Sequence, residues 1–134
     1  MNIVTRLKEI AKLTPHKAAL VDLTKKGVRQ ISYSQLFMLT RCYAQDLRRL
    51  RLNRGAVVLL MMPLSLEFFA AMLAVNSLGL VAMVVDPSSG LKSLAEAVSL
   101  VKPALIVVGK NLFLRGVARL LSLASGIKLS ALPQ

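Results

Sequence analysis

The most apolar part of the chain is residues 55–90, GAVVLLMMPLSLEFFAAMLAVNSLGLVAMVVDPSSG, which contain no lysine or arginine. An apolar run ends at Pro63, Ser65 stands where a helix N-cap is expected, and Gly79 precedes a second run, VAMVV. This spacing predicts a strand of about 6 residues, a helix of about 13 and a strand of about 5, which are ordinary element lengths. Because both strands are apolar at consecutive positions, we expect a parallel sheet that is covered on both faces.

The same stretch also permits a competing interpretation as a membrane-spanning segment. About 20 apolar residues suffice to cross the hydrocarbon core, and residues 56–85 exceed that length. However, Pro63 interrupts the stretch, and Glu67 would lie deep in a span centred on the predicted helix, at a cost of about 3 kcal/mol. We therefore favour the buried strand–helix–strand unit and keep the membrane span as the alternative.

The residues before this stretch predict a helix followed by a hairpin. Residues 2–13 place apolar side chains at helical spacing and basic ones on the remaining face, which is typical of an amphipathic helix. Residues 16–23 and 28–32 predict two strands. The Thr-Lys-Lys-Gly sequence between them supplies a glycine for the positive φ of a tight turn.

A capping-box pattern, Ser32 followed by Gln35, predicts a second helix that extends to about residue 52. We expect Asn53-Arg54-Gly55 to close this helix with a glycine stop. Its predicted buried stripe consists of Leu36, Tyr43, Leu47 and Leu50, with Thr40 at the gap in that stripe. Off the stripe lie Arg41, Arg48, Arg49 and Arg51. Cys42 lies next to the stripe, and we expect it to be a small packing residue.

Further helices and strands alternate after the apolar stretch. Residues 91–101 predict a helix, residues 104–108 a third apolar strand, and residues 111–124 another helix. Residues 127–129 begin a further strand. Helical crossovers between at least three strands imply a parallel sheet with right-handed connections.

The predicted fold class is therefore α/β, with a mainly parallel sheet, helices on both of its faces and an N-terminal β-hairpin. The 134 residues suffice for one hydrophobic core, so we expect one domain or a piece of one. The resemblance described below implies the second of these, a single partial domain. Within it, residues 1–54 hold the first helix, the hairpin and the basic helix. Residues 55–109 form a βαβαβ core, and residues 110–134 form a terminal helix and tail.

The formal net charge of +12 indicates an anionic partner without choosing among nucleic acid, lipid headgroups and phosphates. A basic amphipathic helix at residues 2–13 fits a membrane surface, although such a helix is more often simply the first helix of a domain. Aromatic side chains are not interleaved with the arginines of the second helix, so nucleic acid is the disfavoured partner. The single cysteine excludes an internal disulfide, and no signal peptide is predicted.

Candidate chemical groups are few and scattered. Asp86 is predicted at the carboxyl end of a parallel strand, where open α/β sheets bind ligands, but no second acid or histidine lies beside it in sequence. Residues 88–93, SSGLKS, precede a helix whose free backbone amides suit an anion, yet they fail the Walker spacing. The lone His16 is predicted to be exposed and without a catalytic or metal-binding role. The residues therefore predict no catalytic, cofactor-binding or metal-binding residue.

Several short motifs occur in a fixed order along the chain. They are a P-x-K-x-A-L strand, an S-Y-x-x-L helix entry, a G-x-V strand, a P-x-x-x-E turn into an apolar helix, and a glycine followed eight positions later by proline. Their residues are Pro15, Lys17, Ala19, Leu20, Ser32, Tyr33, Leu36, Gly55, Val57, Pro63, Glu67, Gly79 and Pro87. In this order, residues 2 to about 110 resemble the N-terminal region of the adenylate-forming enzymes, the superfamily of AMP-dependent synthetases and ligases that includes acyl-CoA synthetases. The DPSSG loop is similar to the subgroup that handles long β-hydroxy acyl chains in olefin and β-lactone biosynthesis.

The resemblance implies an ATP-dependent carboxylate or fatty-acyl ligase that uses Mg²⁺ and, in acyl-CoA synthetases, coenzyme A. The family's chemistry is assigned to a Ser/Thr/Gly-rich phosphate loop ending in Pro-Lys, a Tyr-x-x-Thr-Gly-Asp segment and a lysine of a C-terminal domain. None of these occurs among the 134 residues. Ala56 also stands where the family usually has an acidic residue. No catalytic residue is carried over, and we expect the chain to be inactive alone.

Two functional classes stay open. In the first, the chain is the N-terminal part of such a ligase, either a truncated product or a subunit that a second chain completes. In the second, it is a standalone basic module that binds a membrane surface or another protein without catalysis. We expect a cytoplasmic location, with peripheral contact to anionic membranes in the second class. We also expect self-association, because a sheet built for continuation exposes an apolar face and an unpaired edge.

Overall fold

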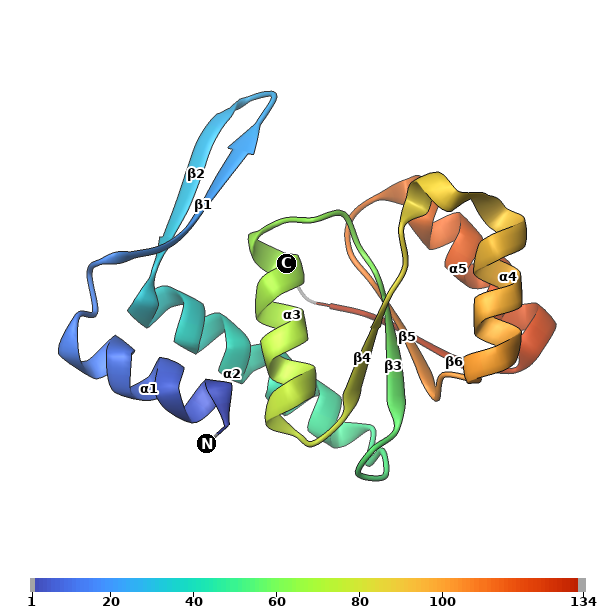
Figure 1. Cartoon of the computed structure of the whole chain (residues 1–134), viewed down its shortest axis with the longest axis horizontal. Coiled ribbons are helices and arrows are strands. Elements are labelled where there is room, and N and C mark those ends of the chain that lie inside the picture. The colour runs from blue at the N-terminus through green and yellow to red at the C-terminus, as the bar shows by residue number, and fades with distance from the viewer. Residues whose placement is uncertain (1, 133–134) are drawn as a thin grey trace. The chain divides into compact units, whose positions relative to one another are not determined.

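A computed structural model describes residues 2–132, apart from the side chains of Pro87 and Leu112. The chain forms two compact units (Figure 1). The first consists of Met1–Arg51 with Leu64–Leu78, and the second of Leu52–Pro63 with Gly79–Gln134. Compact units of this kind are not necessarily independent domains. The single partial domain divided at residues 54 and 109 therefore stays a prediction.

Three helices of the first unit contact one another: α1 (Ile3–Leu13), α2 (Tyr33–Arg49) and α3 (Leu66–Ser77). The Asn2 side chain caps α1 by accepting a hydrogen bond from the Val4 amide, and Ser65 caps α3 by accepting one from the Phe68 amide. Both helices therefore begin where short polar side chains satisfy free backbone amides. The first and third helices confirm the predicted elements.

The hairpin of the first unit pairs β1 (Ala18–Thr24) with β2 (Gly27–Ser32) in antiparallel register, as predicted. At its turn the Thr24 hydroxyl donates to the Gly27 carbonyl at 2.9 Å and accepts from the Lys26 amide at 3.2 Å. Gly27 has a φ of 126°, a conformation that residues with a Cβ rarely adopt. The sequence therefore specifies this turn locally.

The second helix begins as predicted but ends earlier. Ser32 Oγ accepts from the Gln35 amide, and Gln35 Oε1 accepts from the Ser32 amide, which completes the capping box. The predicted glycine stop at Gly55 is wrong. The Leu50 and Arg51 amides bond to carbonyls three residues back, and Arg51 then takes a positive φ of 50°. This tightened last turn ends α2 at Arg49.

The second unit contains a four-stranded sheet in the order β4-β3-β5-β6, and every neighbouring pair is parallel. Its strands are β3 (Val57–Met61), β4 (Val81–Val84), β5 (Leu105–Val108) and β6 (Lys128–Ala131). The connections contain the short helix η1 (Pro87–Ser89), α4 (Gly90–Val101) and α5 (Leu112–Ser125). The α/β class, the parallel sheet and the additional hairpin are thereby confirmed.

Burial differs between the two strands of the apolar stretch. Val58, Leu59 and Leu60 of β3 are at most 1% exposed, and since consecutive residues face opposite ways, β3 is buried on both faces as predicted. In β4, Val81 and Val84 are 49% and 54% exposed. The expectation of full burial is wrong for β4 because this strand lies at the sheet edge. Within residues 2–132, no helix is long and apolar enough to cross a bilayer.

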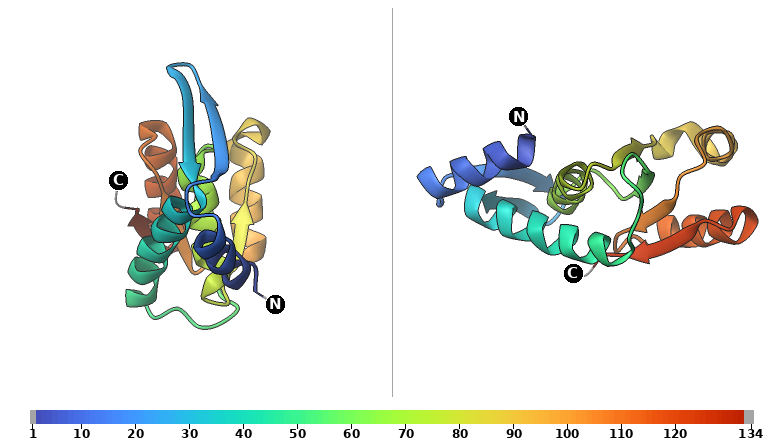
Figure 2. Two further views of the ribbon diagram at one scale, coloured as in Figure 1. Left: turned by 90° about the vertical axis from the view of Figure 1, so that its left-hand side faces the viewer. Right: turned by 90° about the horizontal axis from the view of Figure 1, so that it is seen from below.

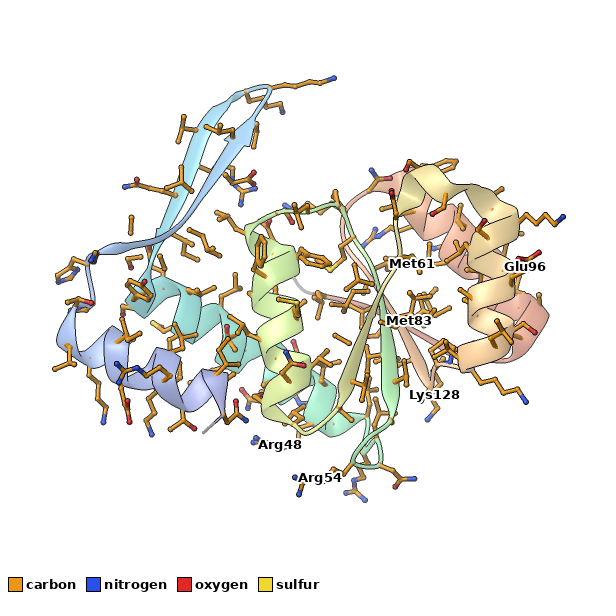
Figure 3. All side chains as sticks on the ribbon, in the orientation of Figure 1. Arg48, Arg54, Met61, Met83, Glu96 and Lys128 are labelled. Carbon is orange, nitrogen blue, oxygen red and sulfur yellow. The ribbon has the colours of Figure 1, made fainter. Side chains whose placement is uncertain are left out.

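The core of the second unit lies where α4 and α5 cover one face of the sheet (Figures 1 and 2). Met83 of β4 packs against the same cluster as Met61 of β3 (Figure 3). The buried cluster consists of Leu59, Met61, Val98, Ile106, Val108, Leu114, Val117 and Ala118. All of these side chains are apolar, so this unit is stabilised chiefly by removal of hydrocarbon from water.

Candidate functional site

Asp86 follows β4 at the carboxyl edge of the sheet, the position that the sequence predicts for a ligand. Its Oδ1 accepts a hydrogen bond from the Ser88 amide at 2.9 Å, and the Ser89 hydroxyl donates to the Asp86 carbonyl at 2.6 Å. The hydrogen bond from the Ser88 backbone lowers the pKa of Asp86. The ionised carboxylate therefore caps the turn η1 and fixes the loop that leads into α4.

Beside Asp86 lies an apolar pocket with a volume of about 130 Å³. Residues of β3 and of the side of α5 that faces the sheet line the pocket. Leu91 and Phe113 also line it, and their side chains are 60% and 70% exposed. The wall residues between them include Leu60, Met61, Met62, Val85, Leu94 and Val117. Such a lining suits a hydrocarbon group rather than a phosphate.

The start of α4 was the predicted anion position. Ser89, its N-cap, makes no side-chain capping hydrogen bond, and Gly90 adopts a positive φ of 85° at the first turn. Free amides at a helix start attract anions, but this feature alone does not define a site. Anion binding by residues 88–93 stays a prediction.

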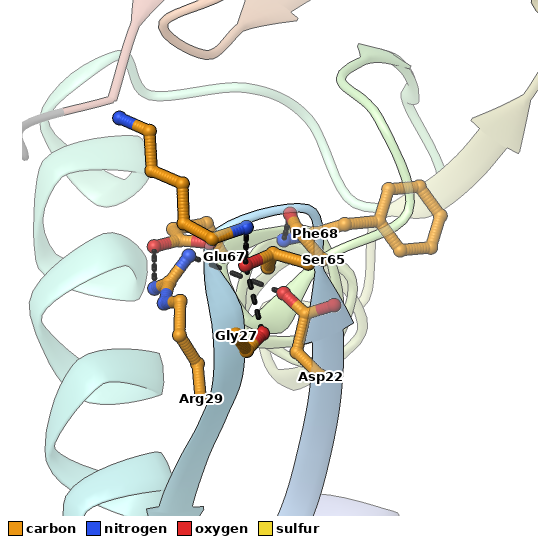
Figure 4. A network of polar contacts seen from close by, with 8 residues as sticks. Asp22, Gly27, Arg29, Ser65, Glu67 and Phe68 are labelled. Carbon is orange, nitrogen blue, oxygen red and sulfur yellow. Dashed lines mark hydrogen bonds and ion pairs between the residues drawn. The ribbon is translucent and has the colours of Figure 1, made fainter.

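An ion-pair network that sequence reasoning missed joins the hairpin to α3 in the first unit (Figure 4). Arg29 of β2 donates to Glu67 of α3 at 2.5 Å and lies 4.0 Å from Asp22 of β1. Partial burial raises the pKa of Glu67, but the Arg29 hydrogen bond, its own backbone amide and the Arg29 charge outweigh burial and lower it overall. The one sequence signal was Glu67 itself, an isolated acid in an apolar stretch.

The arginines of α2 lie along a solvated flank. Arg41 stands 5.9 Å from the Phe37 ring centroid, and Arg49 pairs with Asp46 at 3.5 Å. Cys42 is exposed on this flank, so its expected packing role is wrong. It adjoins buried Tyr43 in sequence but points about 100° away around the helix. The disfavoured nucleic-acid partner stays a prediction.

His16 is exposed before β1, as expected. Between residues 2 and 132, no three side chains of His, Cys, Asp or Glu lie close enough together to hold a metal ion. The structure thus places Asp86 at the carboxyl edge of the sheet in the second unit, whereas His16 belongs to the first unit.

Comparison with known proteins matches AMP-binding enzymes over residues 7–131. The chain is similar to IdnL1, with 35% identity and a TM-score of 0.72 over 81% of this chain and 22% of that chain. It is also similar to the inhibitor-bound N-terminal domain of FACL13 from Mycobacterium tuberculosis, with 22% identity and a TM-score of 0.82. That match covers 98% of this chain and 33% of the FACL13 chain. ATP-bound MatB from Rhodopseudomonas palustris gives 23% identity and a TM-score of 0.78, over 98% of this chain and 25% of the MatB chain. A comparison with curated protein sequences finds no match.

The chain spans between 22% and 33% of the length of these solved chains. FACL13 and MatB show that the α/β fold is shared. The family match extends from α1 through β6, and it agrees with the order of motifs along the sequence. The chain belongs to the AMP-binding enzyme family, the adenylate-forming ligases that its N-terminal motifs resemble.

Proposed function

We propose that this chain is the N-terminal scaffold of an ATP-dependent ligase that activates a carboxylic acid as its adenylate, and that it is inactive alone. The observation that carries the proposal is the family match over residues 7–131 in a chain that spans only 22% to 33% of the solved chains. The substrate class is a fatty acid, including long β-hydroxy acyl chains, and the location is cytoplasmic. Both rest on the resemblance of the N-terminal motifs.

The chain's own residues do not fit the Mg²⁺ of such a ligase. Oxygen ligands are what Mg²⁺ requires, but apart from Asp86 the side chains that line the pocket beside it are apolar. No acidic cluster accompanies it within the described residues. ATP, Mg²⁺ and coenzyme A therefore bind through residues that the remainder of the ligase supplies, on the same polypeptide or on a second chain.

The test is ATP–pyrophosphate exchange by the purified chain with a series of saturated and β-hydroxy fatty acids. We expect no exchange above the rate without protein, because the phosphate loop and the other motifs to which the family's chemistry is assigned do not occur among the 134 residues. IdnL1 assayed with its own substrate serves as the positive control. Fatty-acid-dependent exchange by the isolated chain would show that it is an enzyme in its own right.

A second candidate function, binding to an anionic membrane surface, is favoured by α1. Ile3 and Leu13 on this helix are 60% and 80% exposed, and Arg6, Lys8 and Lys12 add positive charge. Such a helix can lie in the headgroup region. Flotation with vesicles of anionic lipid at low salt tests it, and recovery of all protein at the bottom of the gradient excludes this function.

A further inference from the structure

Helix α5 carries two apolar faces. One consists of Leu114, Val117 and Ala118, which are buried against the sheet. The second consists of Phe113, Leu120 and Leu123, which are 70%, 67% and 84% exposed. Their separations of seven and three positions place them in one stripe along the helix. A helix at the surface of a complete domain needs only the first of these faces, so the second indicates an interface.

Gly116 lies within this second stripe. A Cβ built on it meets no atom within 4 Å, so packing inside the chain does not require glycine there. Glycine in an exposed helix interior lowers helix stability relative to alanine. Its presence is explained if another backbone approaches α5 closely at this position.

The stripe leads into the apolar pocket beside Asp86, because Phe113 belongs to both. Leu91 of α4 forms another part of the pocket and is 60% exposed. The volume of about 130 Å³ is close to that of cavities that accept a benzene-sized group. Interfaces commonly seat one large apolar anchor in such a pocket, with neighbouring contacts that exclude water.

We propose that the α5 stripe (Phe113, Gly116, Leu120 and Leu123) and this pocket form the surface on which the remainder of the ligase docks. A large apolar side chain of that remainder inserts into the pocket. This proposal rests on the proposed function. The solved relatives supply the occupant, since at least two thirds of each of their chains lies outside the part that this chain matches.

A second copy of the chain is the weaker candidate. Each copy carries a formal net charge of +12, so association of two copies is opposed by long-range repulsion. The ionisable residues of α5 are Arg115 and Arg119, both basic, and paired α5 helices would bring these like charges together. A partner with apolar and acidic side chains meets neither obstacle.

The test uses a chimera in which this chain replaces the segment of IdnL1 that it matches, assayed by ATP–pyrophosphate exchange with the IdnL1 substrate. The double variant Leu120→Glu, Leu123→Glu changes sites that are 67% and 84% exposed. It is compared with the control variant Leu23→Glu, Leu100→Glu, whose two sites are 80% and 84% exposed. Leu100 is a suitable control because Glu96, one turn before it on α4, points away from the sheet (Figure 3). Gly116→Leu adds bulk without charge.

We expect the stripe variants and Gly116→Leu to lower exchange by at least about tenfold, as loss of a central interface contact does. The control variant keeps the parental rate. An active chimera that tolerates all stripe variants overturns the docking surface and leaves the proposed function standing. A folded but inactive chimera instead contradicts the proposed function.

The isolated chain provides a second measurement that does not depend on the chimera. We expect it to bind the dye 1-anilinonaphthalene-8-sulfonate, and we expect Leu120→Glu, Leu123→Glu to reduce that binding while the control variant does not. Absence of dye binding, or equal binding by both variants, overturns the surface. Two further outcomes are possible if the active chimera tolerates the stripe variant. Loss of dimers in sedimentation of the isolated variant chain would assign the surface to a second copy. Loss of flotation with anionic vesicles would assign it to a membrane.

Discussion

Both compact units have apolar cores, but they differ in the polar groups that take part in their packing. In the second unit the buried cluster is entirely apolar and joins β3 and β5 to α4 and α5. In the first unit an ion pair between Arg29 and Glu67 joins the hairpin to α3, and the buried helix side contains a hydroxyl, Thr40. Burial of hydrocarbon involves no titrating group and no charge for salt to screen, whereas a charged contact depends on pH and is weakened by screening. The comparison therefore predicts which substitutions and conditions affect each unit.

The largest expected effect is truncation of the apolar cluster of the second unit. Leu59 is fully buried at the centre of the sheet, so Leu59→Ala removes its packing on both helices and leaves a cavity. We expect a loss of about 2 to 5 kcal/mol in the free energy of unfolding, measured by urea denaturation. The matched control is Leu100→Ala at an 84% exposed site, expected to stay within about 0.5 kcal/mol. Similar effects of both substitutions would contradict the assigned core.

In the first unit, replacing a buried polar side chain by an apolar one is expected to raise the free energy of unfolding. Thr40 is 1% exposed, and its Oγ1 has no hydrogen-bond partner among the described residues. Thr40→Val keeps the shape and removes the desolvated hydroxyl, so we expect the free energy of unfolding to rise by about 1 kcal/mol. Thr40→Ser, which keeps the hydroxyl and loses the methyl group, is expected to lower it. Destabilisation by Thr40→Val would reveal a partner for the hydroxyl.

The ion pair between Arg29 and Glu67 should make the stability of the first unit depend on pH. Glu67 has a lowered pKa in the folded chain, so its contribution is complete above the ordinary carboxyl pKa and is lost as pH falls through the lowered value. Because the two side chains are 49% and 34% exposed, a double-mutant cycle of Arg29→Ala and Glu67→Gln should give about 0.5 to 1 kcal/mol at neutral pH. The coupling should shrink in 1 M salt and near pH 2. A coupling that persists under both conditions would count against an electrostatic tether.

The features that the sequence predicted correctly are those decided by neighbouring residues. The capping residues Ser32 and Ser65 and the turn at Gly27 lie within a few positions of the groups they satisfy. The missed features depend on residues far apart. Arg29 and Glu67 are 38 positions apart, and nothing in the pattern of β4 marks it as an edge strand.

The candidate site follows the same rule. Asp86 was correctly placed at the end of a strand, because a strand and the loop after it are local features. Its bond to Ser88 and the pocket beside it required the fold, since Phe113 reaches that pocket from a helix 27 positions further along the chain. The chemistry that the resemblance implies belongs to motifs outside these residues. No pattern within the chain could therefore have located it.

The smallest expected effect distinguishes two glycines at α5. Gly116 lies in the helix with open space around it, so Gly116→Ala should raise the free energy of unfolding of the isolated chain by about 0.5 to 1 kcal/mol. Gly126 ends the helix with a φ of 72°, so Gly126→Ala should lower it by about 1 kcal/mol. Thermal unfolding of both variants measures the difference.

The same pair of substitutions separates folding requirements from docking requirements. Gly126 serves the helix end in the chain itself, so its replacement should destabilise the isolated chain and the IdnL1 chimera alike. Gly116 has no such role in the chain. If a docked backbone approaches it, alanine should stabilise the isolated chain but not the chimera. Equal stabilisation of both by Gly116→Ala would mean that nothing packs closely on the second face of α5.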